Sequence, residues 1–312
     1  MDFLNLILII LTSGIPCALL AIGIFITYRL LDFADLTAEG SFLIGGALCV
    51  SIIKIGGDPA LATVAGLFGG AVCGLITGLL NTKLKIPKLL SGIITMTAAT
   101  SLAMAIMGAT VEEAFTNLVV LGRYDNTIYS VFYPGGIRNM VIESAIMAAI
   151  VIVVILIIYF FFGTEYGMAI RATGINSKMA RSQGINTSLA TIVAVTIANA
   201  LIGLAGALYA QDSRSMDIKS SAGYLVIGLA SILIGESIFG KRNFKNWLIS
   251  VSLGAIVYFI IVNVALELGL PTELKNLLYA ILITLALCLP FIKSFFIKLF
   301  KKKKTNGGIE NA

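Results

Sequence analysis

The stretch VIESAIMAAIVIVVILIIYFFF, residues 141–162, decides the fold class, because it is almost wholly apolar and carries one charged residue, Glu143. A helix needs about 20 apolar residues to cross the hydrocarbon core of a bilayer. Several other runs approach this length, and the 312-residue chain is 58% hydrophobic and only 12% charged, with a mean hydropathy of +1.00. Soluble domains contain about 25% charged residues. The sequence therefore predicts an all-α polytopic membrane protein.

Apolar runs separated by short polar segments predict about eight to ten transmembrane or re-entrant helices. The runs at 41–53 and 222–239 are short and rich in glycine, so each of them either crosses the bilayer or re-enters it. No lysine or arginine precedes Arg29, so the first run is expected to be a retained span rather than a signal peptide. The predicted spans lie near residues 3–27, 41–53, 60–80, 89–108, 141–162, 188–210, 222–239, 247–265 and 275–297.

Positive charge is distributed unevenly between the two ends of these spans. An excess of lysine and arginine marks cytoplasmic segments, so we expect the N-terminus outside and the C-terminus in the cytoplasm. Residues 1–297 then form a transmembrane domain, and residues 298–312 form a basic, disordered cytoplasmic tail near anionic headgroups. Most of the 22 lysines and arginines fall in the segments assigned to the cytoplasm: Arg29, Lys83, Lys85, Lys88, Arg171, Lys178, Arg181, Lys241, Arg242, Lys245, Lys293, Lys298 and Lys301–Lys304.

Residue types exclude several kinds of chemistry. The chain has no histidine, which removes histidine triads, proton relays and metal sites, and its four cysteines lie in apolar runs as expected for small buried side chains. GESIFGK, Gly235–Lys241, has the spacing of a phosphate-binding loop, but Arg242 follows in place of Ser or Thr and no strand precedes it. We expect no catalytic residue, cofactor, metal or nucleic-acid partner. Any ATPase that drives transport must be a separate chain.

Glycine recurs every fourth residue along the span near 60–80. Small residues at this spacing clear one face of a helix, so that another helix backbone can approach closely. The pattern predicts tight helix packing, against a helix of the same chain in preference to a second protomer. The four positions are Gly66, Gly70, Gly74 and Gly78.

Acidic residues lie close to apolar runs in RLLDFADLTAEGSFLIGG, residues 29–46. Ionisable groups near membrane depth are costly, and they usually face a cavity or a pathway. The alternative is a plain cytoplasmic loop in which the acids pair with Arg29. On the first reading, the residues near a translocation path are Asp35, Thr37, Glu39 and Ser41.

The polar stretch TEYGMAIRATGINSKMARSQGIN, residues 164–186, separates the apolar runs 141–162 and 188–210. Asn176 can cap a short helix from Ser177 to Gln183, and Gly184 can close it. An amphipathic helix of this kind could lie on lipid headgroups. Its alanines and glycines suit a protein groove better than a lipid surface, which favours bulky anchors. We therefore predict docking to a protein.

The sequence resembles a known family over roughly residues 5–295. MAIRATGINSKMARSQGINTSLATIVAVTIANALIGLAGALYA, residues 168–210, is similar to the cytoplasmic coupling loop and following span of ABC importer permeases of the branched-chain amino acid and ribose permease family. DFADLTAEGSFLIGG, residues 32–46, looks like the turn into that family's second span. Its ADLTAEGSF form is similar to a subgroup linked to tryptophan and other aromatic amino acids.

The resemblance implies a coupling helix seated in a groove of a separate ABC ATPase subunit. It also implies an extracytoplasmic substrate-binding lipoprotein and a second permease protomer, which we expect to be a copy of this chain in a bacterial plasma membrane. Two readings from other classes stay open: a stand-alone ion-coupled secondary transporter and a membrane transferase. The residues expected to contact the ATPase are Ala172, Gly174, Asn176, Met179, Ala180 and Gly184.

Overall fold

The computed structural model describes residues 3–111, 113, 115–122, 126–131 and 140–267, together with 277, 280, 281 and 284. It confirms the predicted fold class, because each predicted apolar run from 3–27 to 247–265 coincides with a helix. The predicted run 275–297 and the tail 298–312 fall outside the described residues, except for those four positions. The long helices are α1 (Phe3–Phe25), α2 (Thr37–Lys54), α3 (Pro59–Thr82), α4 (Lys88–Thr110), α6 (Met140–Gly163), α9 (Thr187–Asp212), α11 (Tyr224–Phe239) and α12 (Phe244–Glu267).

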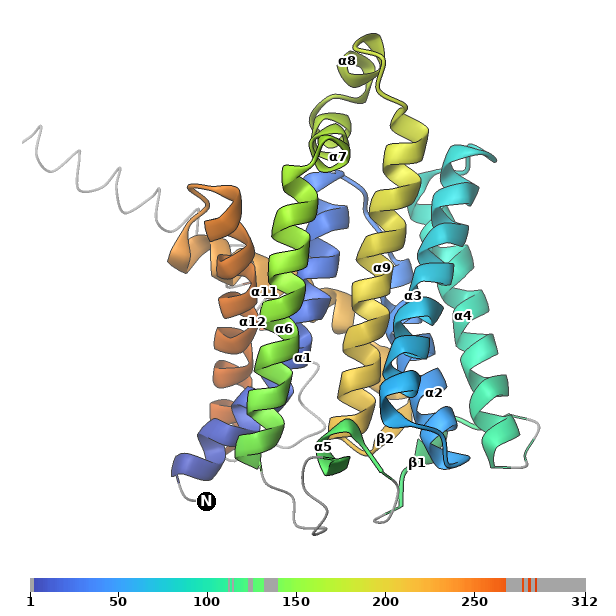
Figure 1. Ribbon diagram of the computed structural model, residues 1–312, viewed down its shortest axis with the longest axis vertical. Helices are drawn as coiled ribbons and strands as arrows, with labels where there is room; N and C mark the ends of the chain where they lie inside the picture. The colour runs from blue at the N-terminus through green and yellow to red at the C-terminus, as the bar shows by residue number, and fades with distance from the viewer. Residues whose placement is uncertain are drawn as a thin grey trace, which may run out of the picture.

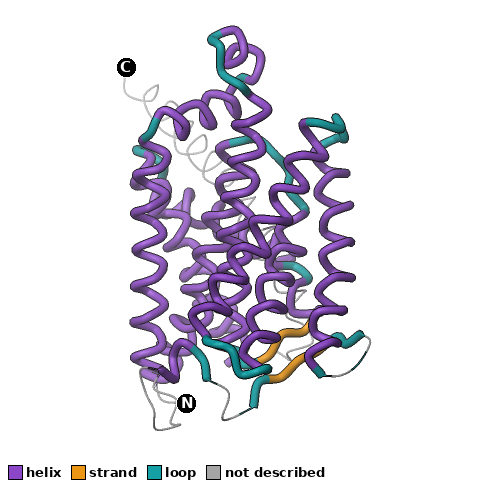
Figure 2. Tube along the Cα trace, turned by 45° about the vertical axis from the view of Figure 1, so that its right-hand side comes forward, coloured by secondary structure: helices purple, strands orange, loops and turns teal. Residues whose placement is uncertain are grey.

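The long helices stand side by side as a bundle, and the short elements sit at its two ends (Figures 1 and 2). Among the described residues, six helices are long and apolar enough to cross a bilayer: α2, α3, α4, α6, α9 and α12. At one end, α7 (Glu165–Ile175) and α8 (Ser177–Ser182) project beyond the bundle. The opposite end carries β1 (Leu118–Val120), β2 (Ser215–Asp217), α5 (Ile128–Val131) and α10 (Ile218–Ser221).

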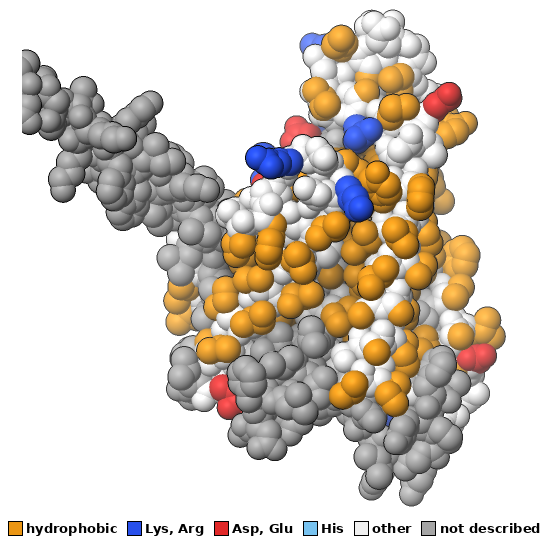
Figure 3. Space-filling view, turned by 60° about the vertical axis from the view of Figure 1, so that its left-hand side comes forward, with side chains coloured by type: hydrophobic (Ala, Val, Ile, Leu, Met, Phe, Trp, Pro, Cys, Tyr) orange, Lys and Arg blue, Asp and Glu red, His pale blue; other side chains and the backbone are white. Residues whose placement is uncertain are grey.

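Charge separates along the bundle as the sequence pattern suggests. Lysine and arginine side chains gather toward the end from which α8 projects, and a broad apolar belt lies below them (Figure 3). The turns between α3 and α4 and between α11 and α12 lie at this same end (Figure 1). Such a belt is the surface that a helical bundle presents to lipid.

The centre of the bundle is α9, which packs against α3, α2 and α1. The four glycines of α3 all face α9 of the same chain. A Cβ atom on Gly70 would lie 2.8 Å from Cα of Gly203, and one on Gly78 would lie 3.0 Å from Cα of Ile192. The distance at Gly70 is shorter than a real Cβ atom allows, and that at Gly78 is tighter than most Cβ contacts, so the two backbones approach closely because the side chains are absent.

The first helix is interrupted before the second begins. After Phe25 the chain forms a π-helical turn, η1 (Ile26–Leu30), and then a non-helical linker, Asp32–Leu36, called the extended segment from here on, before α2 starts at Thr37. The extended segment reaches α9 at Asn199, near the middle of that long helix. Irregular backbone at this depth is tolerated where protein groups satisfy it. Thr37 is therefore the start of the second helix, four residues before the predicted start at Ser41.

A two-stranded ribbon, which the sequence analysis did not predict, closes the end opposite α8. β1 and β2 are antiparallel, with Val119 opposite Met216. Each strand has only three residues, too few for an alternating pattern to be visible. Lys54, at the end of α2, donates a hydrogen bond of 3.2 Å to the carbonyl oxygen of Val120. The ribbon therefore ties the long loop after α4 to the connection after α9.

Candidate functional site

The projecting element α7–α8 is shaped by three capping residues. The Thr164 hydroxyl accepts a hydrogen bond from the amide of Gly167 and begins α7. The Asn176 side chain accepts from the amides of Lys178 and Met179, both at 3.1 Å, and begins α8. The Asn186 side chain accepts from the amide of Leu189 and begins α9. Such caps satisfy amides that a helix start leaves unpaired.

α8 is closed by a glycine, because the chain there adopts a backbone conformation that suits glycine. Gly184 has φ of +82°, and the amide of Ile185 bonds to the carbonyl oxygen of Ala180. This is the usual closure of a helix by a left-handed residue. The chain therefore makes a short helix with a sharp start and a sharp end. The α7–α8 element presents apolar side chains outward: Ile175, at the end of α7, is 87% exposed, and Met179 of α8 is 62% exposed.

The six residues predicted to contact an ATPase do not form a single outward surface. Asn176, Met179 and Gly184 are exposed, whereas Ala180 is buried. Ala172 and Gly174 are half-buried. A Cβ atom on Gly174 would collide with the carbonyl oxygen of Leu30, so this glycine faces inward. The more exposed Ile175 was not among the predicted residues, although it lies between two of them.

α7 is seated on the helix bundle by contacts with η1 and α12. Gly174 lets the end of α7 touch the backbone at Leu30 and Leu31. Ile170 is fully buried, and the Arg171 guanidinium lies 5.2 Å from the ring centre of Phe244. α7 therefore joins the exposed α8 to the π-helical turn that precedes the extended segment.

A buried polar network lies where the extended segment meets α9. Asn199 donates a 2.7 Å hydrogen bond to the Asp35 carboxylate and accepts one of 2.7 Å from the Ser41 hydroxyl. The other Asp35 oxygen accepts from the amide of Thr37 at 2.9 Å. Asp35 is 4% exposed, and Asn199 is fully buried. Because a buried polar group is costly without partners, these bonds hold α2 and α9 in one relative position.

The network continues through threonine hydroxyls to α3 and α4. Thr37 and Thr77 share a hydrogen bond of 2.7 Å, and Thr77 donates to Thr95 at 2.8 Å. All three side chains are buried. Four helices, α2, α3, α4 and α9, are thus linked by side chains from the middle of the bundle. The sequence predicts Asp35, Thr37 and Ser41 as path residues but does not predict that they are hydrogen-bonded to other helices.

The four residues predicted near a translocation path divide into two groups. Asp35, Thr37 and Ser41 belong to the buried network. Glu39 is half-buried, and its carboxylate accepts a 3.0 Å hydrogen bond from the amide of Gly223, just before α11. Next to it, the rings of Phe42, Tyr209 and Tyr224 form a cluster in which Phe42 stacks on Tyr224 at 4.1 Å. The plain-loop alternative required these acids to pair with Arg29, but neither Asp35 nor Glu39 does so.

Arg29 instead joins η1 to the end of α11. Its guanidinium lies 2.6 Å from the Glu236 carboxylate, and the indole N–H of Trp247 donates to the same carboxylate at 2.9 Å. These contacts fix the π-helical turn to α11 and α12, and α7 packs on the same turn through Gly174. The turn is therefore held between two contacts.

Replacing Glu236 by alanine is expected to lower the free energy of unfolding by about 2 kcal/mol, because Arg29 would keep its charge without a partner. The double variant Arg29→Met/Glu236→Met should lose less than the two single losses added together, since no unpaired charge remains. Unfolding of the purified protein in increasing SDS measures both values. A double variant that loses the full sum or more would contradict the prediction.

Sequence reasoning missed Asn199, Thr77, Thr95 and Glu236 because each interacts with a residue far away in the chain. A signal was present for Asn199, the one amide side chain inside the apolar run 188–210. The threonines gave none, since threonine often bonds to its own helix backbone in apolar spans. Among the described residues, no three His, Cys, Asp or Glu side chains lie together as metal ligands would.

Comparison with known sequences assigns this chain to a protein family. The family described as "Branched-chain amino acid transport system / permease component" matches residues 6–287. The tyrosine transport system permease protein of Clostridioides difficile (strain R20291) is 32% identical over 299 residues, which cover 96% of this chain and 94% of that protein.

More distant relatives are named for other solutes. The galactofuranose transporter permease protein of Escherichia coli (strain K12) is 26% identical, with 94% of this chain and 81% of that protein covered. The probable branched-chain amino acid transport permease protein of Methanocaldococcus jannaschii is 24% identical, with 78% of this chain and 77% of that protein covered. No solved structure matches the chain.

Proposed function

This chain belongs to the permease family of branched-chain amino acid transport systems, and we propose that it is the membrane-spanning subunit of an ABC importer for an amino acid, aromatic or branched-chain. The observation that carries the proposal is the projecting α7–α8 element, which displays apolar side chains beyond the bundle end where basic residues gather. Family membership makes it a permease component of an ABC transporter and not an enzyme. The solute, the partners and the orientation are the parts proposed.

An amino acid substrate is supported by the relative named for tyrosine transport, which matches nearly the whole chain. The relatives named for ribose and galactofuranose have lower sequence identity to this chain. The subgroup form ADLTAEGSF, residues 34–42, points toward aromatic amino acids. An aromatic amino acid is therefore the first substrate to test, and leucine is the second.

Three partners follow from the proposal. An ABC ATPase subunit binds the α8 end, an extracytoplasmic lipoprotein delivers substrate to the end with β1 and β2, and a second copy of the chain completes the permease. The charge pattern supports placing the α8 end in the cytoplasm, with the N-terminus outside and the C-terminus inside. The location is then the plasma membrane of a bacterium.

The contacts suggest how a movement of α8 reaches the interior. α8 follows α7 directly, and α7 rests on η1 at Leu30. η1 leads into the extended segment, whose Asp35 is bonded to Asn199. We propose that ATP-driven displacement of α8 shifts this segment, and that Asp35, Thr37, Glu39 and Ser41 lie near the path that opens. Interiors that pack closely switch between discrete arrangements instead of deforming smoothly.

The test is isolation of the intact complex followed by uptake. The chain is tagged at its C-terminus, extracted from native membranes in mild detergent, and analysed for co-purifying chains by mass spectrometry. A stoichiometric ATPase and a lipoprotein are expected, and the reconstituted complex should take up labelled tyrosine only with ATP. A chain that purifies alone, where a known ABC complex stays whole, would overturn the proposal.

The alternative, a stand-alone ion-coupled secondary transporter, is favoured by one observation. Asp35 is a buried acid in the middle of a helical bundle, the kind of group that carries protons in such transporters. Liposomes that contain this chain alone should show no proton-driven uptake if the ABC proposal holds. Uptake that follows an imposed proton gradient without ATP would establish the alternative.

Replacing Met179 by glutamate is expected to reduce ATPase co-purification and uptake at least about tenfold, because a charge would be buried in an apolar interface. Met179 is exposed, so the chain itself should insert and fold as before. The matched control is Ile238→Glu, which adds the same charge at an exposed position at the end of α11. Equal losses in both variants would contradict a role specific to α8.

Gly174 faces inward, and this decides what a substitution at this position can test. A large side chain there would strike the backbone at Leu30, so Gly174→Trp would displace α7 as well as α8. Loss of transport in that variant reports on the seat of α7, whereas Met179→Glu tests the outer surface alone.

A further inference from the structure

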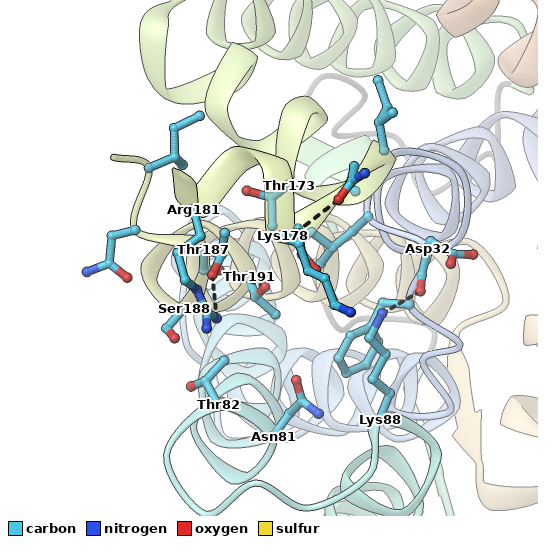
Figure 4. A pocket seen from close by; sticks show the side chains of 18 of the residues that line it. Asp32, Asn81, Thr82, Lys88, Thr173, Lys178, Arg181, Thr187, Ser188 and Thr191 are labelled. Carbon is cyan, nitrogen blue, oxygen red and sulfur yellow. Dashed lines mark hydrogen bonds between the residues drawn. The ribbon is translucent and has the colours of Figure 1, made fainter. Parts of the chain in front are cut away.

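A groove of about 920 Å³ opens beside α8, at the end of the bundle where basic residues gather. Its walls come from the segment after η1, from the turn between α3 and α4, and from the α7–α8 element with the start of α9. Figure 4 shows Lys178 of α8 and Lys88 of α4 extending into the same space from opposite walls. The groove is separate from the outer face of α8 that Met179 marks, since Met179 does not line it.

The lining of the groove is strongly basic. Four cationic residues, Lys85, Lys88, Lys178 and Arg181, face one acid, Asp32. Lys88 donates to the carbonyl oxygen of Asp32 at 2.7 Å, and Arg181 donates to the Thr187 hydroxyl at 3.1 Å, so both are held in place by neutral acceptors. Within the described part of the chain, none of these four cations has an acidic partner at ion-pair distance. The groove therefore attracts an anion.

Backbone geometry fixes two of these residues at an energetic cost. Asp32 has φ of 49° and Lys85 has φ of 57°, and both line the groove. Lys85 lies just past the end of α3, beside a bond from the amide of Ile86 to the carbonyl oxygen of Leu80. Glycine is the usual residue in a left-handed position that closes a helix. Strain of this kind often accompanies a ligand-binding role, which would explain a lysine at this position.

The surroundings of the groove identify the source of the anion. The groove reaches Asn81 of α3 and Thr191 of α9, both within the helical part of their spans. Leu84 and Leu89 do not line the groove, but they neighbour Lys85 and Lys88 in the sequence and are 67% and 49% exposed. Cations next to exposed apolar side chains match a molecule with a charged head and hydrocarbon chains. A free phosphate ion would use the cations and leave the leucines bare.

We propose that this groove binds the phosphate of an anionic phospholipid, whose acyl chains lie along the exposed leucines of the α3–α4 turn. Basic pockets between helices on the cytoplasmic side are a known setting for such headgroups. The lipid would bridge α8 to α3 and α4, which share no other direct hydrogen bond or ion pair within the described part of the chain. The binding proposal depends on the groove and not on which solute the permease carries.

The test uses the full-length chain purified in mild detergent, with bound lipid counted by native mass spectrometry. The probe is dioleoyl phosphatidylglycerol, and dioleoyl phosphatidylcholine is the neutral comparison. Lys85→Gly removes a charge and relieves the strained backbone, so it should fold at least as well as the natural chain. Lys178→Gln removes a second charge. The matched control is Lys241→Gln/Arg242→Gln, which removes two exposed cations from the α11–α12 turn at the same end.

Phosphatidylglycerol retention is expected to fall about fivefold for each lysine removed, and about 25-fold for the Lys85→Gly/Lys178→Gln pair. The control pair should retain lipid as the natural chain does, and phosphatidylcholine should be retained weakly by all. Equal losses in the control pair, or unchanged retention in the groove pair, would overturn the site. Displacement of the lipid by excess inorganic phosphate with equal effect would assign the groove to a soluble anion. Lost ATPase co-purification with unchanged lipid retention would assign it to a protein.

Discussion

Alanine at Gly70 is expected to destabilise the bundle strongly and to lower the yield of folded protein recovered from the membrane. Its Cβ atom would collide with the carbonyl oxygen of Asn199 and would lie 2.8 Å from Cα of Gly203. Both neighbours are backbone atoms of α9, so neither can rotate away. Overpacking a closely packed core costs typically about 1–3 kcal/mol and occasionally more. Backbone contacts place this substitution at the upper end, about 3 kcal/mol. Unfolding in SDS and the yield of monodisperse protein measure the effect.

The neighbouring Gly69 is the matched control for that prediction. A Cβ atom on Gly69 would meet Cδ1 of Leu48 at 2.5 Å and Cγ2 of Ile44 at 2.8 Å, which are side-chain atoms and not backbone atoms. The end of the Leu48 side chain can rotate away, so Gly69→Ala should cost clearly less than Gly70→Ala, about 1 kcal/mol. Both variants add one methyl group to the same helix. Similar stability for Gly69→Ala and Gly70→Ala would show that α3 and α9 are not in the close contact seen here.

The second large effect is expected at Asn199, where alanine should abolish uptake and destabilise the protein by about 2–3 kcal/mol. The variant would remove one hydrogen-bond donor from the Asp35 carboxylate, which keeps the amide of Thr37, and would remove the amide oxygen that the Ser41 hydroxyl donates to. A hydrogen bond to a charged group contributes about 1.5–3 kcal/mol, and a buried group left unsatisfied costs more than the bond alone. Transport should fall further than stability explains, because Asn199 holds the extended segment that leads from η1 to α2.

Asn263→Ala is the control for an asparagine inside a span. Asn263 lies in α12 and donates to the carbonyl oxygen of Phe259 in its own helix, so its loss should change stability by less than about 1 kcal/mol. Uptake of labelled substrate, normalised to the amount of complex in the membrane, compares the two variants. Normal uptake with Asn199→Ala at equal expression would remove the buried network from the transport mechanism.

Most element positions were predictable, because they depend on neighbouring residues. Apolar runs of suitable length marked each long helix before residue 268, and the caps Asn176 and Gly184 marked the start and end of α8. Among the boundaries that differ from the prediction, two have local reasons. α2 begins at Thr37 because Asp35 accepts from its amide, and α1 ends early because the chain passes through a π-helical turn. Neither device leaves a mark in hydrophobic periodicity.

The candidate sites were predictable only in part. The Asn176 and Met179 side chains are exposed as docking residues must be, yet Gly174 and Ala180 turn inward, because α7 and α8 also pack on the bundle. Position in a short sequence motif cannot distinguish the outer face from the inner face when the partner helix is far away in the chain. The basic groove was likewise invisible, since its cations come from α4, α8 and the turn after α3.

The sequence by itself determined that this is a multi-pass helical membrane protein of a permease family, with its basic residues at one end and a short capped helix projecting there. The family follows from the resemblance of residues 32–46 and 168–210, and the other properties follow from composition, local spacing and capping chemistry. The tertiary structure alone decided which groups meet: Arg29 with Glu236, Asp35 with Asn199, and the glycines of α3 with α9. Each pair is separated by more than a hundred residues, so its energy depends on how helices pack in three dimensions.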